Sequence, residues 1–288
     1  MTDNVINLGV LKLGCIGAAP LLDLLLDERA DREDLSVRGF TSGAKLDNDS
    51  CAETTASAIA NKPDLMILVC PNSALPGPKA SRKAISDAGI PLITVSDGPS
   101  KKAYYKKDDD GKQVLNLPDN QGFFILPTDP MIGARREFLD PSEMALFNAD
   151  VIKVLASCGV FRFIQNELDK VIAALKSGET LPLPRANVTA EKAVTAGGFS
   201  NPYAQAKALG ALKITESVAA VTSNGCFVEQ DADKYVTLVA AGHEMMRTAA
   251  SLADQARELE KSTNSILRTP HSTSGDTLSK RQLGEKPS

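Results

Sequence analysis

The sequence predicts an α/β protein: an N-terminal, doubly wound and mostly parallel sheet, then a helical-bundle region and an extended C-terminal tail. Three observations predict this order. Short apolar runs alternate with helical stretches up to about residue 127, longer helical stretches follow, and the chain turns polar from Ser262. Alternating strands and helices are typical of βαβ units, whose strands are parallel. We therefore expect an α/β cofactor-binding region at 1–127, a helical region at 128–261 and a polar segment at 262–288.

The apolar runs of the first region mark its strands. These runs are Val5–Leu13, Ser36–Phe40, Leu65–Cys70 and Pro91–Val95, and the helical stretches between them are Pro20–Asp27, Asp49–Asn61 and Pro78–Ala88. A lysine- and aspartate-rich stretch, Tyr104–Gln121, then precedes the apolar run Phe123–Leu126. Its Asp110-Gly111 pair favours a β-hairpin. We expect this stretch to be a solvated excursion from the sheet.

The second region is predicted to be helical. Asp140 suits a helix cap and Pro141 the first helical position, so a helix begins there and runs to about Lys176, with a break at Gly159. A second helix is expected at Pro202–Val221. A third carries an apolar stripe for a bundle or a subunit interface, formed by Met245, Ala249, Leu252, Ala256 and Leu259. The tail from Ser262 has too little apolar content for a core of its own, so we expect it to wrap a neighbour or to be loose beyond about residue 280.

Composition and charge exclude several classes of function. A net charge of −4 provides no positive field for a nucleic acid. The first residues do not resemble a secretory signal, and no apolar run is long enough to span a membrane, so we expect a cytoplasmic protein. The 5 cysteines are widely spaced, and the 2 histidines, His243 and His271, leave little basis for a metal site or a hydrolytic triad. We expect His243 to be packed in its helix.

The loops after the predicted strands outline a cofactor cleft. In an open parallel sheet, ligands bind at the edge where the carboxyl ends of the strands meet. The loops expected there are rich in Gly, Ser, Thr and Pro, which let a backbone approach a ligand closely. The candidate cofactor-binding residues are Gly14, Cys15, Gly17, Thr41, Ser42, Pro71, Asn72, Pro76 and Gly77. The alternative is that these loops are only the tight turns that any α/β sheet needs.

The phosphate-binding pattern narrows the choice of cofactor. The dinucleotide fingerprint GxGxxG is absent, and no acidic residue ends the second predicted strand, so a standard NAD site is disfavoured. The hydroxyls of Thr41 and Ser42 beside Lys45 suit a phosphate on NADP or on another phosphorylated cofactor. No GxxxxGK[ST] loop occurs, which excludes a P-loop.

Several long segments resemble one protein family nearly letter for letter. They are Leu24–Asp34, Ile132–Pro141, Gly225–Asp231, His243–Arg247, Ala256–Lys261 and Leu267–His271. The family is that of the archaeal F420-dependent methylenetetrahydromethanopterin dehydrogenases, and the resemblance extends from about residue 8 to residue 280. It implies an oxidoreductase of one-carbon metabolism that transfers a hydride reversibly between methylenetetrahydromethanopterin and coenzyme F420. This chemistry needs neither a metal nor a covalent or acid–base catalytic residue.

The resemblance also implies a pterin site and an assembly. The substrate-binding candidates are Arg135, Glu137, Asn148, Glu229 and His271. For four of them a simpler alternative stays open: a helix-cap ion pair for Arg135 and Glu137, a surface carboxylate for Glu229 and an exposed loop histidine for His271. The resemblance implies a homo-oligomer as well, with a hexamer as the expected state.

Two loops depart from the family pattern. The first loop reads K-C-G-N-[IL]-G in the family but Lys12–Gly17 here has Cys15 at the Asn position, and the third loop has Val69 and Cys70 in place of two glycines. We expect these two residues to add side chains where a ring or phosphate would approach. The departures leave NADP or a flavin as an alternative to F420, and a non-catalytic pterin-binding subunit as a third hypothesis.

Overall fold

The computed structural model describes residues 5–26, 32–130 and 140–288. Contacts between residues group the chain into two compact units. The α/β unit contains residues 1–126, 165–187 and 273–275, and the helical unit contains 127–164, 188–272 and 276–288. The division into three regions that the sequence suggested stays a prediction.

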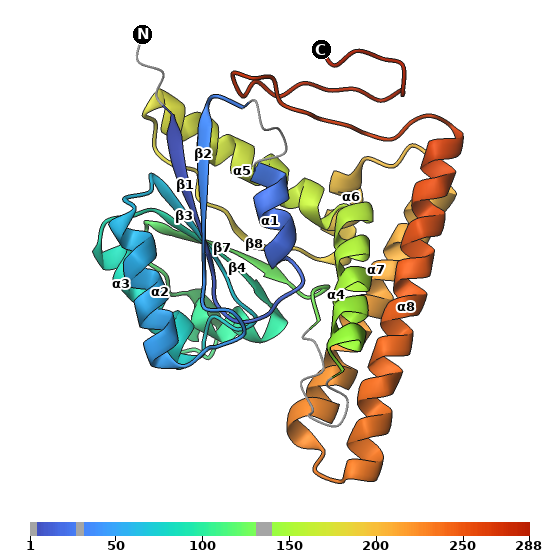
Figure 1. Cartoon of the computed structure of the whole chain (residues 1–288), viewed down its shortest axis with the longest axis horizontal. Helices are drawn as coiled ribbons and strands as arrows, with labels where there is room; N and C mark the ends of the chain where they lie inside the picture. The colour runs from blue at the N-terminus through green and yellow to red at the C-terminus, as the bar shows by residue number, and fades with distance from the viewer. Residues whose placement is uncertain (1–4, 27–31, 131–139) are drawn as a thin grey trace. The chain divides into compact units, whose positions relative to one another are not determined.

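A parallel sheet forms the centre of the α/β unit (Figure 1). Its strands are β1 (Ile6–Lys12), β2 (Leu35–Thr41), β3 (Leu65–Val69), β4 (Leu92–Asp97), β7 (Gln121–Leu126) and β8 (Arg185–Asn187). They lie in the order β2-β1-β3-β4-β7-β8, and every neighbouring pair is parallel. The predicted doubly wound sheet is therefore confirmed. The sequence did not predict β8, whose three residues contain no apolar run.

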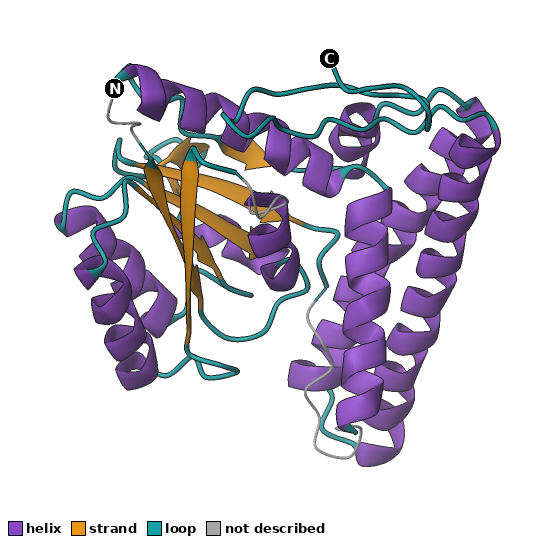
Figure 2. Ribbon diagram, turned by 45° about the horizontal axis from the view of Figure 1, so that its top comes forward, coloured by secondary structure: helices purple, strands orange, loops and turns teal. Residues whose placement is uncertain are grey.

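Helices cover both faces of this sheet. They are α1 (Ala19–Leu26), α2 (Asn48–Ala60), α3 (Pro76–Asp87) and the 3₁₀ helix η1 (Gly98–Ala103). Helices α2 and α3 pack together on one face, and α1 lies on the other (Figure 2). Because both faces are covered, β3 is buried along its whole length, which explains its continuous apolar sequence. Asp47 caps α2 by accepting a hydrogen bond from the Ser50 amide at 2.9 Å.

The predicted excursion contains a β-hairpin. Strands β5 (Tyr105–Lys107) and β6 (Gln113–Leu115) are antiparallel, and Gly111 turns the chain between them with a φ of +77°. The hairpin is mostly exposed, as expected. The residue directly before the hairpin, Tyr104, is instead fully buried, and its ring stacks on Phe123 with the ring centroids 4.1 Å apart.

The helical unit is a bundle followed by a polar hairpin. Its elements are α4 (Pro141–Ser157), α5 (Val160–Ser177), α6 (Ala190–Gly197), α7 (Pro202–Ser223), a π-helical turn (Asn224–Val228) and α8 (Ala232–Ser262), with part of α5 in the α/β unit. The predicted break at Gly159 is confirmed, because its φ is +96° and a Cβ there would overlap the Ala193 carbonyl. The sequence missed α6.

The predicted stripe on α8 needs a correction. Ala249 and Ala256 are buried, but Met245, Leu252 and Leu259 are only half-buried, and Met246 is fully buried instead. Helix α8 packs chiefly on α7, and the face that it buries there lies one position further along the chain than the spacing suggested. Small alanines therefore form more of the contact than large apolar side chains do.

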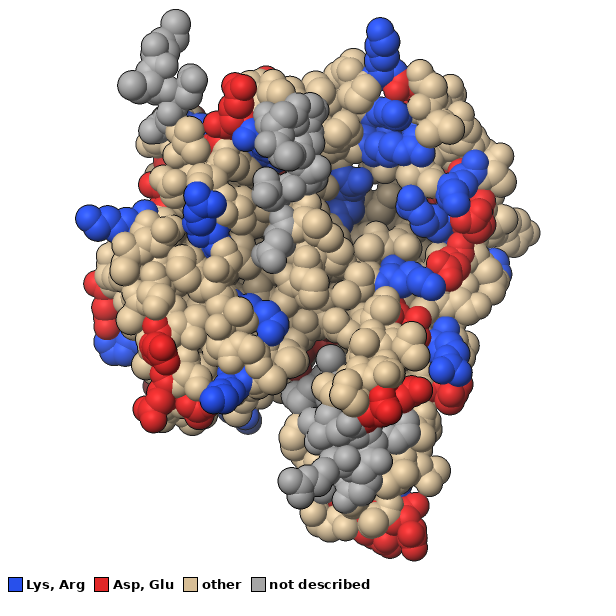
Figure 3. All heavy atoms as spheres, in the orientation of Figure 1, with Lys and Arg blue, Asp and Glu red and all other residues tan. Residues whose placement is uncertain are grey.

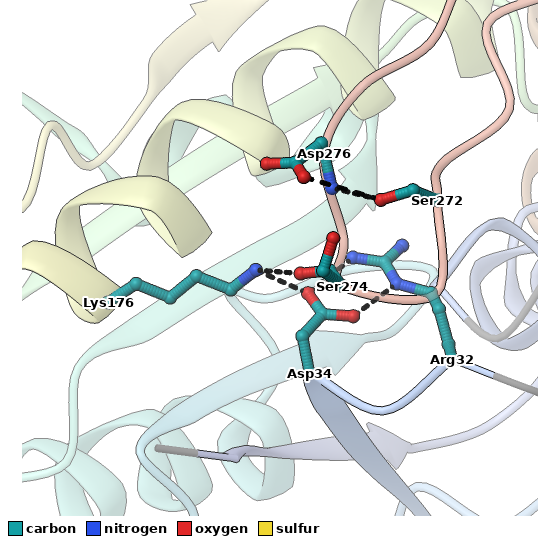
Figure 4. Close-up of polar contacts among 6 residues, drawn as sticks. All are labelled: Arg32, Asp34, Lys176, Ser272, Ser274 and Asp276. Carbon is teal, nitrogen blue, oxygen red and sulfur yellow. Dashed lines mark hydrogen bonds and ion pairs between the residues drawn. The ribbon is translucent and has the colours of Figure 1, made fainter. Parts of the chain in front are cut away.

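The C-terminal segment folds back on itself. Bridges pair Arg268 with Lys280 and His271 with Thr277, and the backbones of Ser279 and Ser288 exchange hydrogen bonds of 3.1 and 3.2 Å. The end of the chain is thus paired rather than loose. The tip of this hairpin, residues 273–275, belongs to the α/β unit. There the Glu33 amide donates to the Thr273 carbonyl at 2.8 Å. Figure 4 shows that Lys176 donates to the Ser274 carbonyl, at 3.3 Å.

Acidic and basic side chains are interspersed on the face shown in Figure 3. Among the described residues no single helix is long and apolar enough to cross a membrane, and only α4 and α5 reach that length and composition as a bent pair. Within the same described ranges, no group of three or more His, Cys, Asp or Glu side chains is placed to hold a metal ion.

Candidate cofactor site

The loops that the sequence assigned to a cofactor cleft lie at the switch point of the sheet. Strand β1 has β2 on one side and β3 on the other, so the strand order reverses there. The last residue of β1, Lys12, pairs with both Thr41 of β2 and Val69 of β3. The loops after these three strands therefore begin side by side. This is the place where open α/β sheets bind their ligands, and we call it the rim.

The first and second loops are bonded to each other. The Gly14 amide donates to Ser42 Oγ at 3.3 Å, and Ser42 Oγ donates in turn to the Lys45 carbonyl at 2.7 Å. Gly14 has a φ of +74°, and the place of its absent Cβ is filled by the side chain of Leu46, 2.7 Å away. Gly14 is therefore required by the turn and by this packing, whereas the neighbouring Cys15 side chain is half-buried and reaches the surface of the rim.

The third loop presents part of its surface at the same rim. Pro71 is buried, Asn72 is half-buried and Pro76 is exposed in the first turn of α3. Asn72 Oδ1 accepts a hydrogen bond from the Ala74 amide at 3.0 Å, which fixes the turn. A Cβ on Gly77 would stand 2.7 Å from both the Leu46 carbonyl and Cys51 Sγ, so only glycine lets α3 approach α2 so closely.

The two residues that replace family glycines do not obstruct the rim. Val69 and Cys70 are both completely buried, and Cys70 packs in the apolar cluster beneath the sheet together with Leu13, Cys51 and Leu68. Burial, with the nearby charge of Asp97, raises the pKa of the Cys70 thiol far above its usual range. The expectation that these side chains occupy the approach of a ring or phosphate is therefore wrong.

A hollow beside the second loop offers donors for an anion. Its volume is about 420 Å³, and it is lined by Phe40, Thr41, Ser42, Lys45, Ser50, Glu53, Thr54 and Ser57. The predicted residues Thr41 and Ser42 thus face it together with Lys45. Asp47 already caps α2, and the hydroxyls of Ser42, Thr54 and Ser57 donate to backbone carbonyls. The Thr41 hydroxyl and the Lys45 ammonium remain as donors that suit a phosphate group, whereas the Glu53 carboxylate in the same lining opposes an anion.

Of the candidates for the pterin side, those within the described residues lie on separate elements. Arg135 and Glu137 fall outside the described residues. Asn148 is half-buried on α4, and its Oδ1 atom is buried without a hydrogen-bond partner among the described residues. A buried amide oxygen without a donor is costly, so a ligand that supplies one fits this position.

Glu229 and His271 have visible structural roles. Glu229 Oε1 accepts hydrogen bonds of 2.9 Å from the amides of both Gln230 and Asp231, at the turn between the π-helical segment and α8. His271 is only 1% exposed and forms a bridge with Thr277 in the C-terminal hairpin, so it is not the exposed loop histidine of the alternative. Their position on a pterin site stays a prediction.

His243 is a packed residue, as expected. It is 8% exposed, its ring lies 4.5 Å from that of Phe147 on α4, and its Nδ1 is 4.0 Å from Glu143 Oε2. Burial lowers the pKa of His243 in spite of the Glu143 carboxylate, which favours the neutral imidazole.

Sequence reasoning missed a buried polar network beneath the third loop. It joins Ser73, Ser96, Ser100 and Tyr104 and ends on the guanidinium of Arg82. The one available signal was an aromatic residue at the start of an otherwise polar stretch. Its partners come from four separate segments, so no spacing in the sequence reveals the network.

Comparison with known proteins identifies the family that this chain resembles along almost its whole length. The family model of methylene-5,6,7,8-tetrahydromethanopterin dehydrogenase matches residues 6–288. The F420-dependent methylenetetrahydromethanopterin dehydrogenase of Archaeoglobus fulgidus is 53% identical over 98% of this chain and 99% of the relative. The enzyme of the same name from Methanocaldococcus jannaschii is 49% identical over the same shares.

A solved structure matches the fold throughout. It is an F420-dependent methylenetetrahydromethanopterin dehydrogenase in complex with methylenetetrahydromethanopterin and coenzyme F420, and it is 42% identical. The match has a TM-score of 0.90 and covers 99% of this chain and 100% of the other. The resemblance noted from the sequence is thus confirmed, and the chain belongs to the F420-dependent methylenetetrahydromethanopterin dehydrogenase family.

Proposed function

We propose that this protein catalyses reversible hydride transfer between methylenetetrahydromethanopterin and coenzyme F420. The observation that carries the proposal is the full-length match, at 42% identity and a TM-score of 0.90, to a structure that holds both compounds. In the forward direction the methylene carbon gives up a hydride and becomes a methenyl cation, and F420 takes up that hydride together with a proton from water. Bound F420 supplies the ring that accepts the hydride.

The rim supports the F420 half of this proposal. We assign Gly14, Cys15, Gly17, Thr41, Ser42, Pro71, Asn72, Pro76 and Gly77 to F420. The half-buried Cys15 and Asn72 and the exposed Pro76 offer surface to a flat ring, and Thr41 and Lys45 offer donors to a phosphate. Ser42 holds the second loop, because its hydroxyl donates to the Lys45 carbonyl. Gly14 and Gly77 act through the close packing that shapes the loops. These loops hold a ring by backbone and small side chains, which position a reactant without taking part in the chemistry.

The helical unit supplies the proposed pterin side. We assign Asn148, with its unpartnered amide oxygen, to hydrogen bonding with the pterin. Arg135, Glu137, Glu229 and His271 complete the proposal on the strength of the family resemblance. Direct hydride transfer between two planar reactants needs no side chain that acts as an acid or a base.

An isotope experiment tests the reaction. Methylenetetrahydromethanopterin that carries deuterium on its methylene carbon is mixed with F420 and the purified protein in ordinary water. The expected result is loss of the absorbance of oxidised F420, with deuterium recovered on the reduced deazaflavin. Deuterium recovered in the solvent, or no turnover by folded protein, would contradict direct hydride transfer.

The same assay separates the alternatives. NADP or a flavin in place of F420 is favoured if either compound is reduced faster than F420 at equal concentration. A non-catalytic pterin-binding subunit is favoured if calorimetry detects methylenetetrahydromethanopterin binding while no acceptor is reduced. The buried positions of Val69 and Cys70 support F420, because they remove one of the reasons for a change of cofactor.

We also propose a homo-oligomer. In the helical unit the π-helical turn exposes two adjacent apolar residues, Phe227 at 58% and Val228 at 70%. Adjacent exposed apolar side chains are typical of a surface that pairs with another protein chain. Light scattering of the intact protein is expected to give a multiple of 30.5 kDa, and Phe227→Ser is expected to lower it. A hexamer and a cytoplasmic location stay predictions.

A further inference from the structure

Hydroxyl groups of serine and tyrosine hold the third loop of the rim by hydrogen bonds on its buried side. The Ser73 amide donates to Ser100 Oγ at 3.0 Å, and Ser73 Oγ donates to the Tyr104 hydroxyl at 2.9 Å. The Tyr104 hydroxyl lies 3.2 Å from Ser96 Oγ on the other side. Ser73, Ser96, Ser100 and Tyr104 are all 0% exposed. The loop that carries Asn72 is therefore tied to the end of β4 and to η1 by bonds that water does not reach.

The Tyr104 side chain has little freedom to move. Its ring stacks on Phe123 at 4.1 Å with an interplanar angle of 9°, and the Arg82 guanidinium lies 4.8 Å from the centre of the ring. Arg82 is itself 7% exposed and donates to Gln121 Oε1 at 3.0 Å. Burial raises the pKa of Tyr104 to about 12, so the hydroxyl keeps its proton. It accepts from Ser73 and can therefore donate to Ser96.

We propose that Tyr104 is a positioning residue for F420: it acts through Ser73 to hold the third loop in the shape that receives the deazaflavin. This inference rests on the proposed function. The inference also assigns a role to the first residue of the lysine-rich excursion. The chain passes beneath the third loop of the rim at Tyr104, before it continues into the exposed hairpin. Tyr104 itself does not contact the cofactor, since it has no exposed surface.

The test uses a pair of matched variants of the intact protein. Tyr104→Phe removes only the hydroxyl and keeps the ring between Phe123 and Arg82. Tyr105→Phe removes the same atom from the next residue, whose ring also touches Phe123, edge-on at 5.9 Å, and whose hydroxyl has no hydrogen bond among the described residues. Calorimetry measures the Kd for F420, and steady-state rates give kcat and both KM values.

The expected result is selective. Loss of the buried hydrogen bonds in Tyr104→Phe raises the Kd and the KM for F420 about tenfold, whereas kcat and the KM for methylenetetrahydromethanopterin stay within about twofold. Tyr105→Phe changes each value by less than about twofold. Ser73→Ala, which removes the donor of the same bond, reproduces the Tyr104→Phe effect. The double variant is no weaker than the weaker single variant, because both changes break one interaction.

The outcomes separate this inference from the proposed function. Wild-type protein that binds no F420 overturns the proposed function and the inference with it. Wild-type protein that binds F420 with the same Kd as Tyr104→Phe overturns the inference alone. A variant that loses affinity for F420 and for the pterin equally, in step with a lower Tm, contradicts a positioning role and indicates general loosening.

Discussion

Different interactions stabilise the two edges of the parallel sheet: hydrogen bonds between neutral groups at one edge and ion pairs at the other. At the carboxyl edge, neutral hydroxyls of Ser42, Ser73 and Tyr104 hold loops whose outer surfaces stay accessible. At the amino edge, Asp34 directly precedes β2, and its side chain is 8% exposed between Arg32 at 2.7 Å and Lys176 at 2.5 Å, with the hairpin tip 273–275 packed on it (Figure 4).

This difference separates binding from stability. Charged groups that are buried and paired are costly to separate, so they favour one fixed arrangement. Hydroxyl networks under exposed loops fix a shape and still present backbone and side chains outward. The amino edge therefore closes the sheet, whereas the carboxyl edge keeps accessible loops at the position where such folds bind their ligands.

The largest effect is expected where the amino edge is most crowded. A Cβ on Gly275 would overlap the Asp34 carboxylate, and the residue has a φ of +85°. Gly275→Ala is expected to lower the free energy of unfolding by about 3 kcal/mol. Gly111→Ala, at a φ of +77° with open space around it, is the matched control and costs about 1 kcal/mol. Urea denaturation measures both losses. If the two variants lose the same unfolding free energy, the amino edge is not tightly packed around Gly275.

The ion cluster at the same edge predicts a dependence on pH. Burial acts to raise the pKa of Asp34, but hydrogen bonds and charges of Arg32 and Lys176 outweigh it and lower the pKa from 3.8 to about 2. Because the folded state has the lower pKa, the stabilisation is complete above about pH 4 and is lost as the pH falls towards 2. The loss amounts to about 2 kcal/mol.

The matched variant for this prediction is Asp34→Asn. The difference in unfolding free energy between the wild type and the variant is expected to shrink by about 2 kcal/mol between pH 5 and pH 2. Urea denaturation at intermediate pH values measures it. A difference that stays constant over this range would show that the carboxylate is not held by its two cations.

A smaller and different effect is expected at the carboxyl edge. Ser42→Ala removes the oxygen that joins the first two loops, and we expect it to cost about 1 kcal/mol and to raise the KM for F420 about threefold. Ser217→Ala is the control, since among the described residues that hydroxyl bonds within an exposed turn of α7, at 3.1 Å from the Lys213 carbonyl. If both variants keep the wild-type KM, the loop junction does not shape the F420 site.

Most of the fold was predictable from the sequence. Strands that are buried on both faces appear in it as apolar runs, and Gly and Pro mark the ends of these runs. The elements missed were short or polar: β8 contains only Arg185, Ala186 and Asn187. The α8 stripe was placed one residue early because α7 meets a face rich in alanine. Alanine gives only a weak signal in a hydropathy pattern, although its small side chain favours close packing of two helices.

The candidate site was predictable in outline only. Parallel strands bring their carboxyl ends together, so the positions of Gly14, Thr41 and Pro71 at one rim follow from strand order. The direction of a side chain does not follow: Cys70 points into the core, and Leu46 fills the space beside Gly14. The support from Tyr104 depends on contacts with Ser73 and Phe123, which only the folded chain brings together.

The central claim, that F420 binds at the rim, has a direct chemical test. Of the 5 cysteines only Cys15 is half-buried, while Cys51, Cys70, Cys158 and Cys226 are buried, so a thiol reagent is expected to modify Cys15 first in the native protein. The Cys15→Ser variant identifies the labelled site. F420 at ten times its Kd leaves about a tenth of the sites free and should slow the modification about tenfold. An unchanged rate at that concentration, with F420 bound, would contradict the account.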